Sequence, residues 1–438
     1  MLAMGIDVGT TNICVAVTDT EKKETICVKS DSNAFLPTDK LYERIQSPER
    51  ILSIVNNLIE QATDEVGEPE VIGVTGQMHG IVYLNGNGVA VSPLYTWQDA
   101  RGNEIYKDGK TYVQVLCEMG FSPIASGYGS ATHFYNTLNG LVPEDTVKIC
   151  TIHDYVAMTL CGSKSPIIHS SDAASLGLFD LKNFKFFDNA PFDTSVFGEV
   201  VNDCKIIGKT EKGIPVSVAI GDNQASFFGS VEDIEDSVLL NIGTGSQISV
   251  CSKYTKACAA RGLELRPLNG DYCLLVGASL CGGRAFGILE NFFRETLKMF
   301  DVDKGEKLYE YMQTQKPSAG TVLPEVLPLF AGTRENPDVR ASVTGLDIDN
   351  FTPQNIIHAF CEGMVCELFD MYPGKGASAL LPEQTLYGAG NGIRKNPLMR
   401  EIIKRRFGSE PIRSTYIEEG AAGAAKFACE GLKKSERK

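Results

Sequence analysis

The sequence has few features of metal-binding, secreted or membrane proteins. Its 13 cysteines include no C-x-x-C pair, so the sequence predicts no zinc site with closely spaced ligands. They lie scattered, many of them in apolar strings, which indicates buried, reduced thiols. No apolar run approaches the length of a membrane span, and no basic-then-apolar segment opens the chain. We therefore expect a cytoplasmic protein.

The charge balance excludes further classes of partner. The formal net charge is −14, which repels nucleic acid and anionic membrane surfaces, so neither is an expected partner. A small anionic ligand remains possible, because a local cluster of N–H donors binds phosphate even in an acidic protein.

Length and composition indicate an ordinary globular protein with more than one domain. The chain has 438 residues and is 43% apolar, which suits two domains of roughly 200 residues each, or three smaller ones. The acidic run at residues 232–236 is typical of a solvated linker. We therefore place a boundary near Gly229 and predict domains at residues 1–229 and 230–438.

A glycine-centred hairpin near the start of the chain is the strongest local signal. Apolar residues alternate on both sides of residues 7–12, DVGTTN, which predicts two strands and a tight turn. Backbone N–H groups and the hydroxyls of Thr10 and Thr11 can converge there on a phosphate, with Asp7 beside them for a divalent cation. The alternative is an ordinary hairpin with a polar turn.

A second hairpin repeats this pattern in the other half of the chain. Residues 241–245, NIGTG, align with residues 7–11, DVGTT, and apolar strands again lie on both sides. Two such hairpins far apart in sequence suggest two similar domains that grip one nucleotide. A coincidental pair of hairpins is the alternative.

Polar residues also follow two apolar strands in the first half. The strand at residues 71–75 leads into Gln77, and the strand at residues 216–220 leads into Asp222. With a helix predicted at residues 47–61, this order indicates a mixed α/β sheet, in which ligands bind at strand ends. Asp222 is therefore a candidate general base, and a helix N-cap is its other possible role.

Two further segments offer sugar-binding groups. Trp97, the only tryptophan, lies beside Asp99 and Arg101, and a ring face with polar neighbours suits a sugar. A core tryptophan next to a surface ion pair is equally compatible. Asp154 lies at a predicted helix start, where capping competes with substrate binding.

Glycine-rich segments stand out in the second half and at its end. Residues 388–392, GAGNG, leave room for a flat base to lie on the backbone. Residues 277–284 bring glycines and Arg284 to a predicted helix start, which favours an anion. The small residues at 419–425 predict a helix that packs closely against its neighbours.

Taken together, these motifs make the sequence similar to the FGGY carbohydrate kinases, which share the duplicated ATPase core of actin and the heat-shock chaperones. The resemblance extends over nearly the whole chain, and its most specific parts are residues 7–11, 77–80, 97–101, 221–226 and 388–391. It implies an α/β fold with two actin-like (ribonuclease H-like) ATPase domains and a ligand cleft between them, and it implies ATP and Mg²⁺ as cofactors.

The resemblance also implies roles for individual residues. Asp222 matches the catalytic base and Asp7 the residue that positions the metal ion. The ATP-binding set is Thr10, Thr11, Asn12, Gly243, Thr244, Gly245, Gly388, Gly390 and Asn391. The sugar-pocket positions are Gln77, Met78, His79, Trp97 and Asp99, to which we add Asp154 and Asp222. Gly245 departs from the family pattern, since many relatives carry a hydroxyl residue there.

Within the family, residues 77–80, 96–99, 151–155 and 221–226 are most similar to the kinases of a seven-carbon ketose, with five-carbon ketose kinases as the alternative. The expected chemistry is transfer of the γ-phosphate of ATP to a sugar hydroxyl that Asp222 deprotonates. The non-kinase alternatives are an actin-like or chaperone-like ATPase and a catalytically inactive sugar-binding protein. The expected oligomeric state is a monomer or a homodimer.

Overall fold

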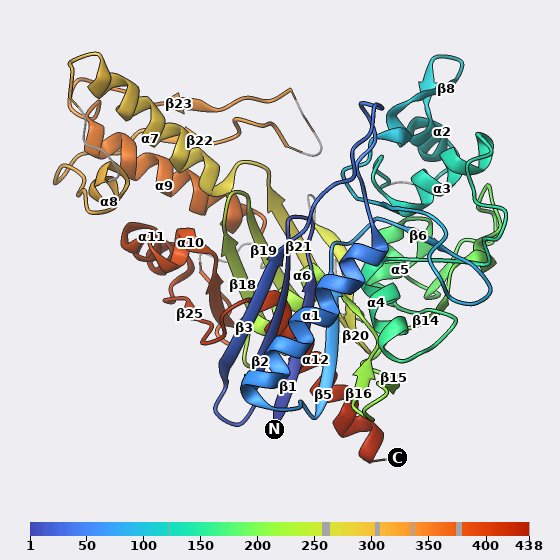
Figure 1. The fold of residues 1–438 in the computed structure, drawn as a ribbon. Coiled ribbons are helices and arrows are strands. Elements are labelled where there is room, and N and C mark those ends of the chain that lie inside the picture. Colours follow the sequence, from blue (N-terminus) through green and yellow to red (C-terminus); the bar gives the residue numbers. More distant parts are fainter. Residues whose placement is uncertain are drawn as a thin grey trace. The chain divides into compact units, whose positions relative to one another are not determined.

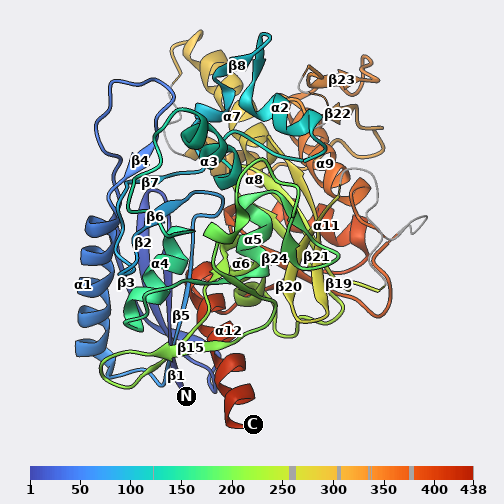
Figure 2. The same cartoon turned by 90° about the vertical axis from the view of Figure 1, so that its right-hand side faces the viewer.

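The structure is a computed structural model that describes residues 1–121, 123–255, 263–302, 307–333, 336, 338–373 and 379–437. The chain forms two compact units (Figures 1 and 2). The first comprises Met1–Gly229, Pro267–Gly270 and Thr415–Lys438, and the second comprises Ser230–Arg266 and Asp271–Ser414. The first unit thus breaks off at the residue that the sequence indicated. The C-terminal segment, which we predicted within residues 230–438, belongs instead to the first unit.

The first unit is built on one mixed sheet. Its strands follow the order β15-β16-β5-β1-β2-β3, and β17 pairs with β5 off this path. Strands β1 and β5 are parallel, whereas β2 and β3 continue the sheet in antiparallel fashion. The strands are β1 (Leu2–Val8), β2 (Asn12–Asp19), β3 (Glu24–Ser32), β5 (Val71–Gly76), β15 (Ile206–Lys209), β16 (Pro215–Ser217) and β17 (Ile220–Gly221).

Side chains alternate between the two faces of this sheet. Met4, Ile6 and Val8 of β1 share one hydrophobic core with Ile51 and Val55 of helix α1 (Pro48–Val66). Ser47 caps α1 by accepting the Arg50 N–H at 3.1 Å, as its Ser-Pro start predicted. Helix α12 (Glu419–Glu436) packs on the opposite face of the same strands (Figure 1).

Small residues let α12 lie unusually close to the sheet. A methyl group added at Gly5 would lie 1.7 Å from the carbonyl oxygen of Ala421, and one at Gly73 would lie 2.0 Å from that of Ala424. Glycine is therefore required at both strand positions. The prediction that residues 419–425 form a closely packed helix is confirmed, and this packing explains why the C-terminus joins the first unit.

The remaining α-helices of the first unit have seven to ten residues each. They are α2 (Tyr112–Glu118), α3 (Gly129–Leu138), α4 (Ile152–Leu160), α5 (Ser170–Leu176) and α6 (Asp222–Ser230). Two-residue or three-residue strands pair as β4 (Ile45–Gln46) with β7 (Leu94–Tyr95), β6 (Val82–Leu84) with β10 (Lys148–Cys150), β8 (Ile105–Lys107) with β9 (Lys110–Thr111), β11 (Ile167–His169) with β14 (Glu199–Val201), and β12 (Phe179–Asp180) with β13 (Lys185–Phe186).

The polar residues 171–175 lie in helix α5. The helix forms because the His169 side chain accepts the Ser171 N–H at 3.2 Å, which caps its first turn.

The second unit repeats the central motif of the first. Its sheet has the order β20-β21-β19-β18-β24-β25. Strand β24 is parallel to β18, whereas β19 is antiparallel to both β18 and β21. This matches the parallel β5–β1 pair followed by β2 and β3, so the predicted duplication is confirmed. The strands are β18 (Ser237–Ile242), β19 (Ser246–Lys253), β20 (Glu264–Asn269), β21 (Tyr272–Ser279), β24 (Thr385–Ala389) and β25 (Ile412–Arg413), with β22 (Glu325–Leu327) and β23 (Ser342–Thr344) as a separate pair.

Helices cover this second sheet and close its own hydrophobic core, which takes residues from β18, α7, α9 and α11. The helices are α7 (Gly282–Lys298), α8 (Lys307–Gln313), α9 (Pro353–Asp370), α10 (Asn391–Arg394) and α11 (Pro397–Phe407). Thr352 and Asn396 cap α9 and α11, and a proline occupies the first position of each helix.

The structure also bears on two expectations from the sequence, the state of the cysteines and the lack of a membrane span. Every cysteine that the structure describes is a free thiol, and most are buried, as the apolar strings around them predicted. Among the described residues, none of the helices combines the length and apolar character needed to cross a membrane.

The close packing of α12 makes Gly5 a sensitive position. In Gly5→Ala the new methyl group meets backbone rather than a movable side chain. We expect the free energy of unfolding to fall by about 3 kcal/mol or more, measured by urea denaturation.

The matched control is Gly287→Ala in α7, where the described chain, apart from the two adjacent residues and the helix's own backbone, has no atom within 4 Å of the added methyl group. It should leave stability unchanged or raise it by up to about 1 kcal/mol, because alanine favours a helix. A Gly5→Ala protein that unfolds at the wild-type urea concentration would contradict this account of the packing.

Candidate functional site

Three predicted polar residues come together at one edge of the first sheet. Strands β1 and β17 both lie parallel to β5, with Asp7 and Ile220 each paired to Thr75. Asp7 is therefore one residue from the end of β1, while Gln77 and Asp222 directly follow β5 and β17. Carboxyl ends of parallel strands are the usual ligand-binding edge of an α/β sheet.

Asp222 is the first residue of helix α6 and is half-buried. The Asn223 side-chain amide donates to Asp222 Oδ1 at 2.9 Å and also lies 3.8 Å from the Met78 sulfur. The Gly221 N–H donates to Ser171 Oγ at 3.0 Å, which ties this strand end to α5. The carboxylate thus stands at a helix start, as predicted, with neighbours that restrict its position.

Asp7 lies in an environment that disfavours its charge. Burial, and next the charge of Asp222, raises the pKa of Asp7 to about 7, although His153 acts in the opposite direction. A methyl group at Gly420 of α12 would lie 2.6 Å from Asp7 Oδ2, so the helix start lies directly against this carboxylate. Two neighbouring carboxylates, one of them buried, form an arrangement that a divalent cation would stabilise.

The first glycine turn is joined to the predicted sugar residues by side-chain hydrogen bonds. Trp97 Nε1 donates to Thr10 Oγ1 at 3.0 Å, and Thr10 Oγ1 donates to Gln77 Oε1 at 3.3 Å. Gln77 Nε2 donates to Gln46 Oε1 at 2.8 Å, and Gln46 Nε2 donates back to the Thr10 carbonyl at 2.8 Å. Thr11 and Asn12 are exposed. The turn and the sugar residues therefore belong to one polar network.

Gln46 was absent from the predicted site. It lies in a two-residue strand before α1, and its amide bridges Thr10 and Gln77 while fully buried. A buried glutamine is uncommon, but the sequence around it shows no motif, so only the fold identifies it.

His79 adopts a strained conformation next to this network. Its φ of 73° lies in the left-handed region, which a non-glycine residue adopts at a cost and mainly at functional sites. Its Nδ1–H donates to the Ser175 carbonyl at 2.7 Å, and its ring stacks on Tyr128 with centroids 4.4 Å apart and planes at 9°. The sequence analysis did not predict Tyr128 and Ser175 for this site. They lie at the start of α3 and in α5, both distant in sequence from His79.

Two predicted substrate residues have other partners in the structure. Asp99 is fully buried, and its two oxygens accept from the Arg101 guanidinium at 2.7 and 3.0 Å. Asp154 is 1% exposed, and its Oδ2 accepts from the Thr151 hydroxyl at 2.7 Å in a capping box. The helix-capping alternative is thus present at Asp154. Met78 is buried against Gly221.

The second glycine turn lies at the start of a long helix within the second unit. The N–H groups of Gly283 and Arg284 donate to the carbonyls of Gly243 and Thr244 at 3.1 and 2.9 Å. Gly283 has no room for a side chain, since a methyl group there would lie 2.1 Å from the Gly243 carbonyl oxygen. The helix start that the sequence marked as anion-friendly therefore directly adjoins the turn.

The third glycine segment packs on the same strand end. Gly390 has φ 82°, and a methyl group there would lie 2.5 Å from the Ile242 carbonyl oxygen. A methyl group at Gly392 would lie 2.4 Å from the Ile242 side chain. Strand β24 runs parallel to β18, which brings Gly388–Asn391 beside Gly243–Gly245 although about 145 residues separate them.

A cavity of about 1020 Å³ opens beside these turns within the second unit. This is at the upper end of the volume range of small-molecule sites. Of the ATP residues predicted in the second unit, Gly243, Thr244 and Asn391 line it, whereas Gly245, Gly388 and Gly390 are not among its lining residues. The further lining residues include Arg284, Phe286, Gly287, Asn291, Tyr309, Glu310, Gln313, Met364, Lys395 and Asn396.

The lining combines aromatic, amide and cationic side chains. Phe286 and Tyr309 stack edge to face with centroids 5.1 Å apart, while Arg284 and Lys395 supply positive charge. An aromatic wall with a few polar groups suits a nucleotide base, and cations suit its phosphates. These residues lie in or between α7, α8, α10 and α11, which are far apart in the sequence. No sequence motif therefore predicted that they line one cavity.

The chain is similar to known proteins along nearly its whole length. Residues 2–229 match the N-terminal domain of the FGGY family of carbohydrate kinases. Human sedoheptulokinase is 26% identical over 482 aligned residues, which cover 97% of this chain and 96% of that protein.

Two solved structures show the same fold. Xylulose kinase from Rhodospirillum rubrum matches with a TM-score of 0.80 at 19% identity, over 99% of this chain and 90% of that chain. Plasmodium falciparum glycerol kinase, solved with ADP, matches with a TM-score of 0.72 at 18% identity, also over 99% and 90%. The predicted actin-like, ribonuclease H-like α/β fold is confirmed. Since the matched domain spans more than half of the sequence, the chain belongs to the FGGY family of carbohydrate kinases and is an ATP-dependent sugar kinase.

Proposed function

We propose that this protein phosphorylates sedoheptulose to sedoheptulose 7-phosphate by in-line transfer of the γ-phosphate of ATP. The observation that carries the chemistry is the placement of Asp7, Gln77 and Asp222 at adjacent strand ends. The choice of a seven-carbon ketose rests on the similarity to human sedoheptulokinase. The similarity of fold to xylulose kinase makes xylulose the second candidate substrate.

In this proposal Asp222 is the general base. A primary sugar hydroxyl is a weak nucleophile at neutral pH, and Asp222 accepts its proton as the oxygen attacks the γ-phosphorus. Most of the acceleration in phosphoryl transfer comes from alignment and charge neutralisation. The hydrogen bond from Asn223 holds the Asp222 carboxylate in one orientation, which favours alignment of the attacking oxygen.

The sugar contacts in this proposal are Gln77, Met78, His79 and Trp97. Trp97 is 46% exposed, so its ring face is accessible to the C–H groups of a sugar. In this proposal Asp99 and Asp154 do not contact the sugar but order the segments around it. The Asp99–Arg101 pair orders residues 97–101, and Asp154 caps α4.

ATP binding is assigned to both glycine hairpins and the cavity of the second unit. Thr10, Thr11 and Asn12 contribute N–H and hydroxyl donors from the first turn. Gly243, Thr244 and Gly245 contribute the second turn, and Gly388, Gly390 and Asn391 the surface on which the adenosine lies. Gly245 acts through its backbone, because it lacks the hydroxyl that many relatives have.

Mg²⁺ is the metal that this proposal assigns to Asp7. The residues present fit it, since the buried Asp7 carboxylate beside Asp222 has a pKa raised to about 7 and gains from a nearby cation. When bound, the ion neutralises charge on the β- and γ-phosphates.

The direct test measures ADP release with purified protein, MgATP and a panel of ketoses. We expect the highest kcat/KM with sedoheptulose, and a higher value with xylulose would assign the protein to the pentuloses. Absence of sugar-dependent ADP release with every ketose would favour the inactive sugar-binding alternative. ADP release that no sugar stimulates would favour the actin-like ATPase.

Asp222→Ala is the matched variant in this assay. Loss of a general base should lower kcat by about 100-fold or more, while ATP affinity measured by calorimetry stays near that of the wild type. Turnover within a few-fold of the wild type would rule out the assignment of Asp222.

The nucleotide assignment predicts the effect of filling the cavity. Gly287 lines it, and the described atoms leave open space where its side chain would begin. Gly287→Leu should weaken ATP and ADP binding by about tenfold or more through lost volume, with Gly287→Ala close to the wild type. Calorimetric titration gives both affinities, and unchanged nucleotide binding in Gly287→Leu would place the nucleotide elsewhere.

The raised pKa of Asp7 predicts an unusual pH dependence of stability. The folded pKa is about 7 against an ordinary 3.8, so the contribution of this group to stability is fully present only below the ordinary pKa and is lost as pH rises to 7. In metal-free protein, Asp7→Asn should therefore change stability little near pH 4 but raise it at pH 8. The gain should be a few kcal/mol, because one pKa unit is worth about 1.4 kcal/mol.

Asp19→Asn serves as a control with the opposite sign. The N–H groups of Lys22 and Glu21 donate to Asp19 and lower its pKa, so its carboxylate stabilises the fold above the ordinary pKa. Asp19→Asn should lower stability at pH 8. Thermal melts at both pH values measure the two effects, and a loss of stability in Asp7→Asn at pH 8 would contradict the first.

A further inference from the structure

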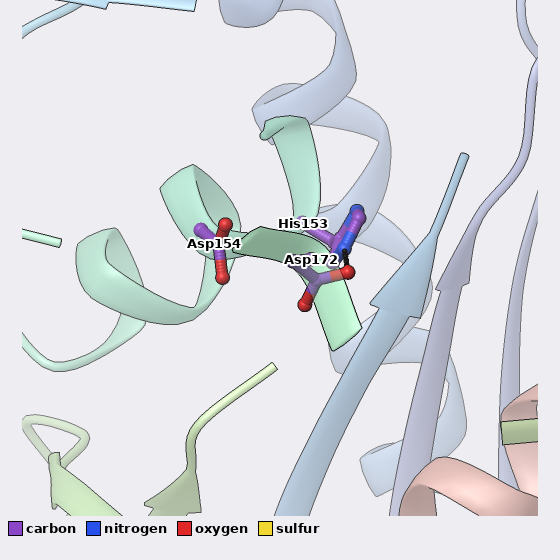
Figure 3. Close-up of side chains that lie close together, drawn as sticks. All are labelled: His153, Asp154 and Asp172. Carbon is purple, nitrogen blue, oxygen red and sulfur yellow. Dashed lines mark ion pairs between the residues drawn. The ribbon is translucent and has the colours of Figure 1, made fainter. Parts of the chain in front are cut away.

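A histidine and two aspartates meet in the interior of the first unit, outside the residues assigned to ATP. His153 and Asp154 lie on α4 and Asp172 lies on α5 (Figure 3). Their exposed fractions are 0%, 1% and 0%. One ligand atom from each residue lies within 4.8 Å of the others. Two helices thus direct three potential metal ligands to one buried point.

The polar atoms of this cluster are not satisfied by hydrogen bonds. Within the described chain, both ring nitrogens of His153, both oxygens of Asp172 and Oδ1 of Asp154 have no hydrogen-bond partner. His153 Nε2 is 2.9 Å from Asp172 Oδ1, but this ion pair lacks hydrogen-bond geometry. Thr151 occupies only the other oxygen of Asp154. Since buried polar groups are nearly always paired, these atoms indicate a missing common partner.

The distances suit a metal ion as that partner. With metal–ligand bonds of about 2.1 Å, adjacent ligands of an octahedral ion lie about 3 Å apart and opposite ligands about 4.2 Å apart. The 2.9 Å separation of His153 Nε2 and Asp172 Oδ1 matches an adjacent pair. The other pairs of ligand atoms in the set lie within 4.8 Å of one another.

The ligand types indicate which metal. Mg²⁺ prefers oxygen ligands and retains several waters, whereas one buried imidazole with two buried carboxylates suits Zn²⁺, Mn²⁺ or Fe²⁺. We propose that His153, Asp154 and Asp172 form a binding site for a divalent transition-metal ion, distinct from the Mg²⁺ that accompanies ATP. The ion links α4 to α5.

Charge around the cluster supports a cation there. Burial raises the pKa of Asp172 well above its ordinary value and that of Asp154 to about 7, with neighbouring carboxylates adding to each shift. The same cation lies near Asp222, whose charge acts on both Asp172 and His153.

The test uses the full chain, stripped with a chelator and free of nucleotide. Calorimetric titration with Zn²⁺ or Mn²⁺ should show one tight equivalent, and the melting temperature should rise with the metal. Asp172→Asn and His153→Ala should each lower the affinity by more than the roughly 10- to 100-fold that loss of an outer-sphere partner costs. The metal should no longer raise their melting temperature.

Two controls separate this site from other histidines and from the Mg²⁺ site. His133→Gln removes another buried histidine of the first unit, one that hydrogen-bonds Tyr83 at 3.0 Å, and should retain the tight equivalent. Asp7→Asn should retain it as well. Loss of binding in Asp7→Asn alone would assign the ion to the catalytic edge and overturn the proposal.

A spectroscopic readout keeps the proposal falsifiable if the ligand variants fail to fold. Pulsed electron paramagnetic resonance of the wild-type Mn²⁺ form should detect one coordinated imidazole nitrogen. Absence of a tight equivalent in the wild type, or a bound ion without a nitrogen ligand, would overturn the proposal. Both readouts are independent of catalysis, so they stand or fall separately from the sugar kinase assignment.

Discussion

The site of the first unit depends on the close approach of helix α12 to strands β1 and β5. Glycines at positions 5 and 73 and alanines of the helix bring backbone against backbone, where any side chain would separate them. The same approach places Gly420 against the Asp7 carboxylate and encloses it. Asp7, near the start of the chain, is thus buried in part by a helix near the end of the chain. Burial is the main cause that raises the pKa of Asp7.

Several carboxylates of the first unit are buried at a cost to the free energy of folding. A buried charge without a partner is costly, yet Asp7, Asp154 and Asp172 all lie where burial raises their pKa. Such clusters are typical of functional sites, where the missing stabilisation comes from ligands or metal ions. Burial lowers the pKa of His153 as well, although the charges of Asp154, Asp222 and Asp7 act in the opposite direction.

Duplication explains why two glycine turns far apart in sequence have the same form. In both units a parallel strand pair is followed by antiparallel strands, and the turn lies between the first antiparallel pair. Each turn then acquires different partners. Thr10 is held by Trp97 and Gln77, whereas Gly243 and Thr244 adjoin the start of α7. A repeated backbone therefore supports two different surroundings.

The sequence by itself determined the two glycine hairpins, helix α1, the duplication and the polar strand ends, because alternation, caps and glycine turns are local signals. It predicted Asp7, Gln77 and Asp222 for this reason. Only the tertiary structure decided that Gln46, Tyr128 and Ser175 join them, and that Asp99 is bound to Arg101. It also placed α12 in the first unit and grouped His153, Asp154 and Asp172. These relations join residues distant in sequence, and whether a carboxylate is buried, paired or exposed depends on neighbours that no local pattern specifies.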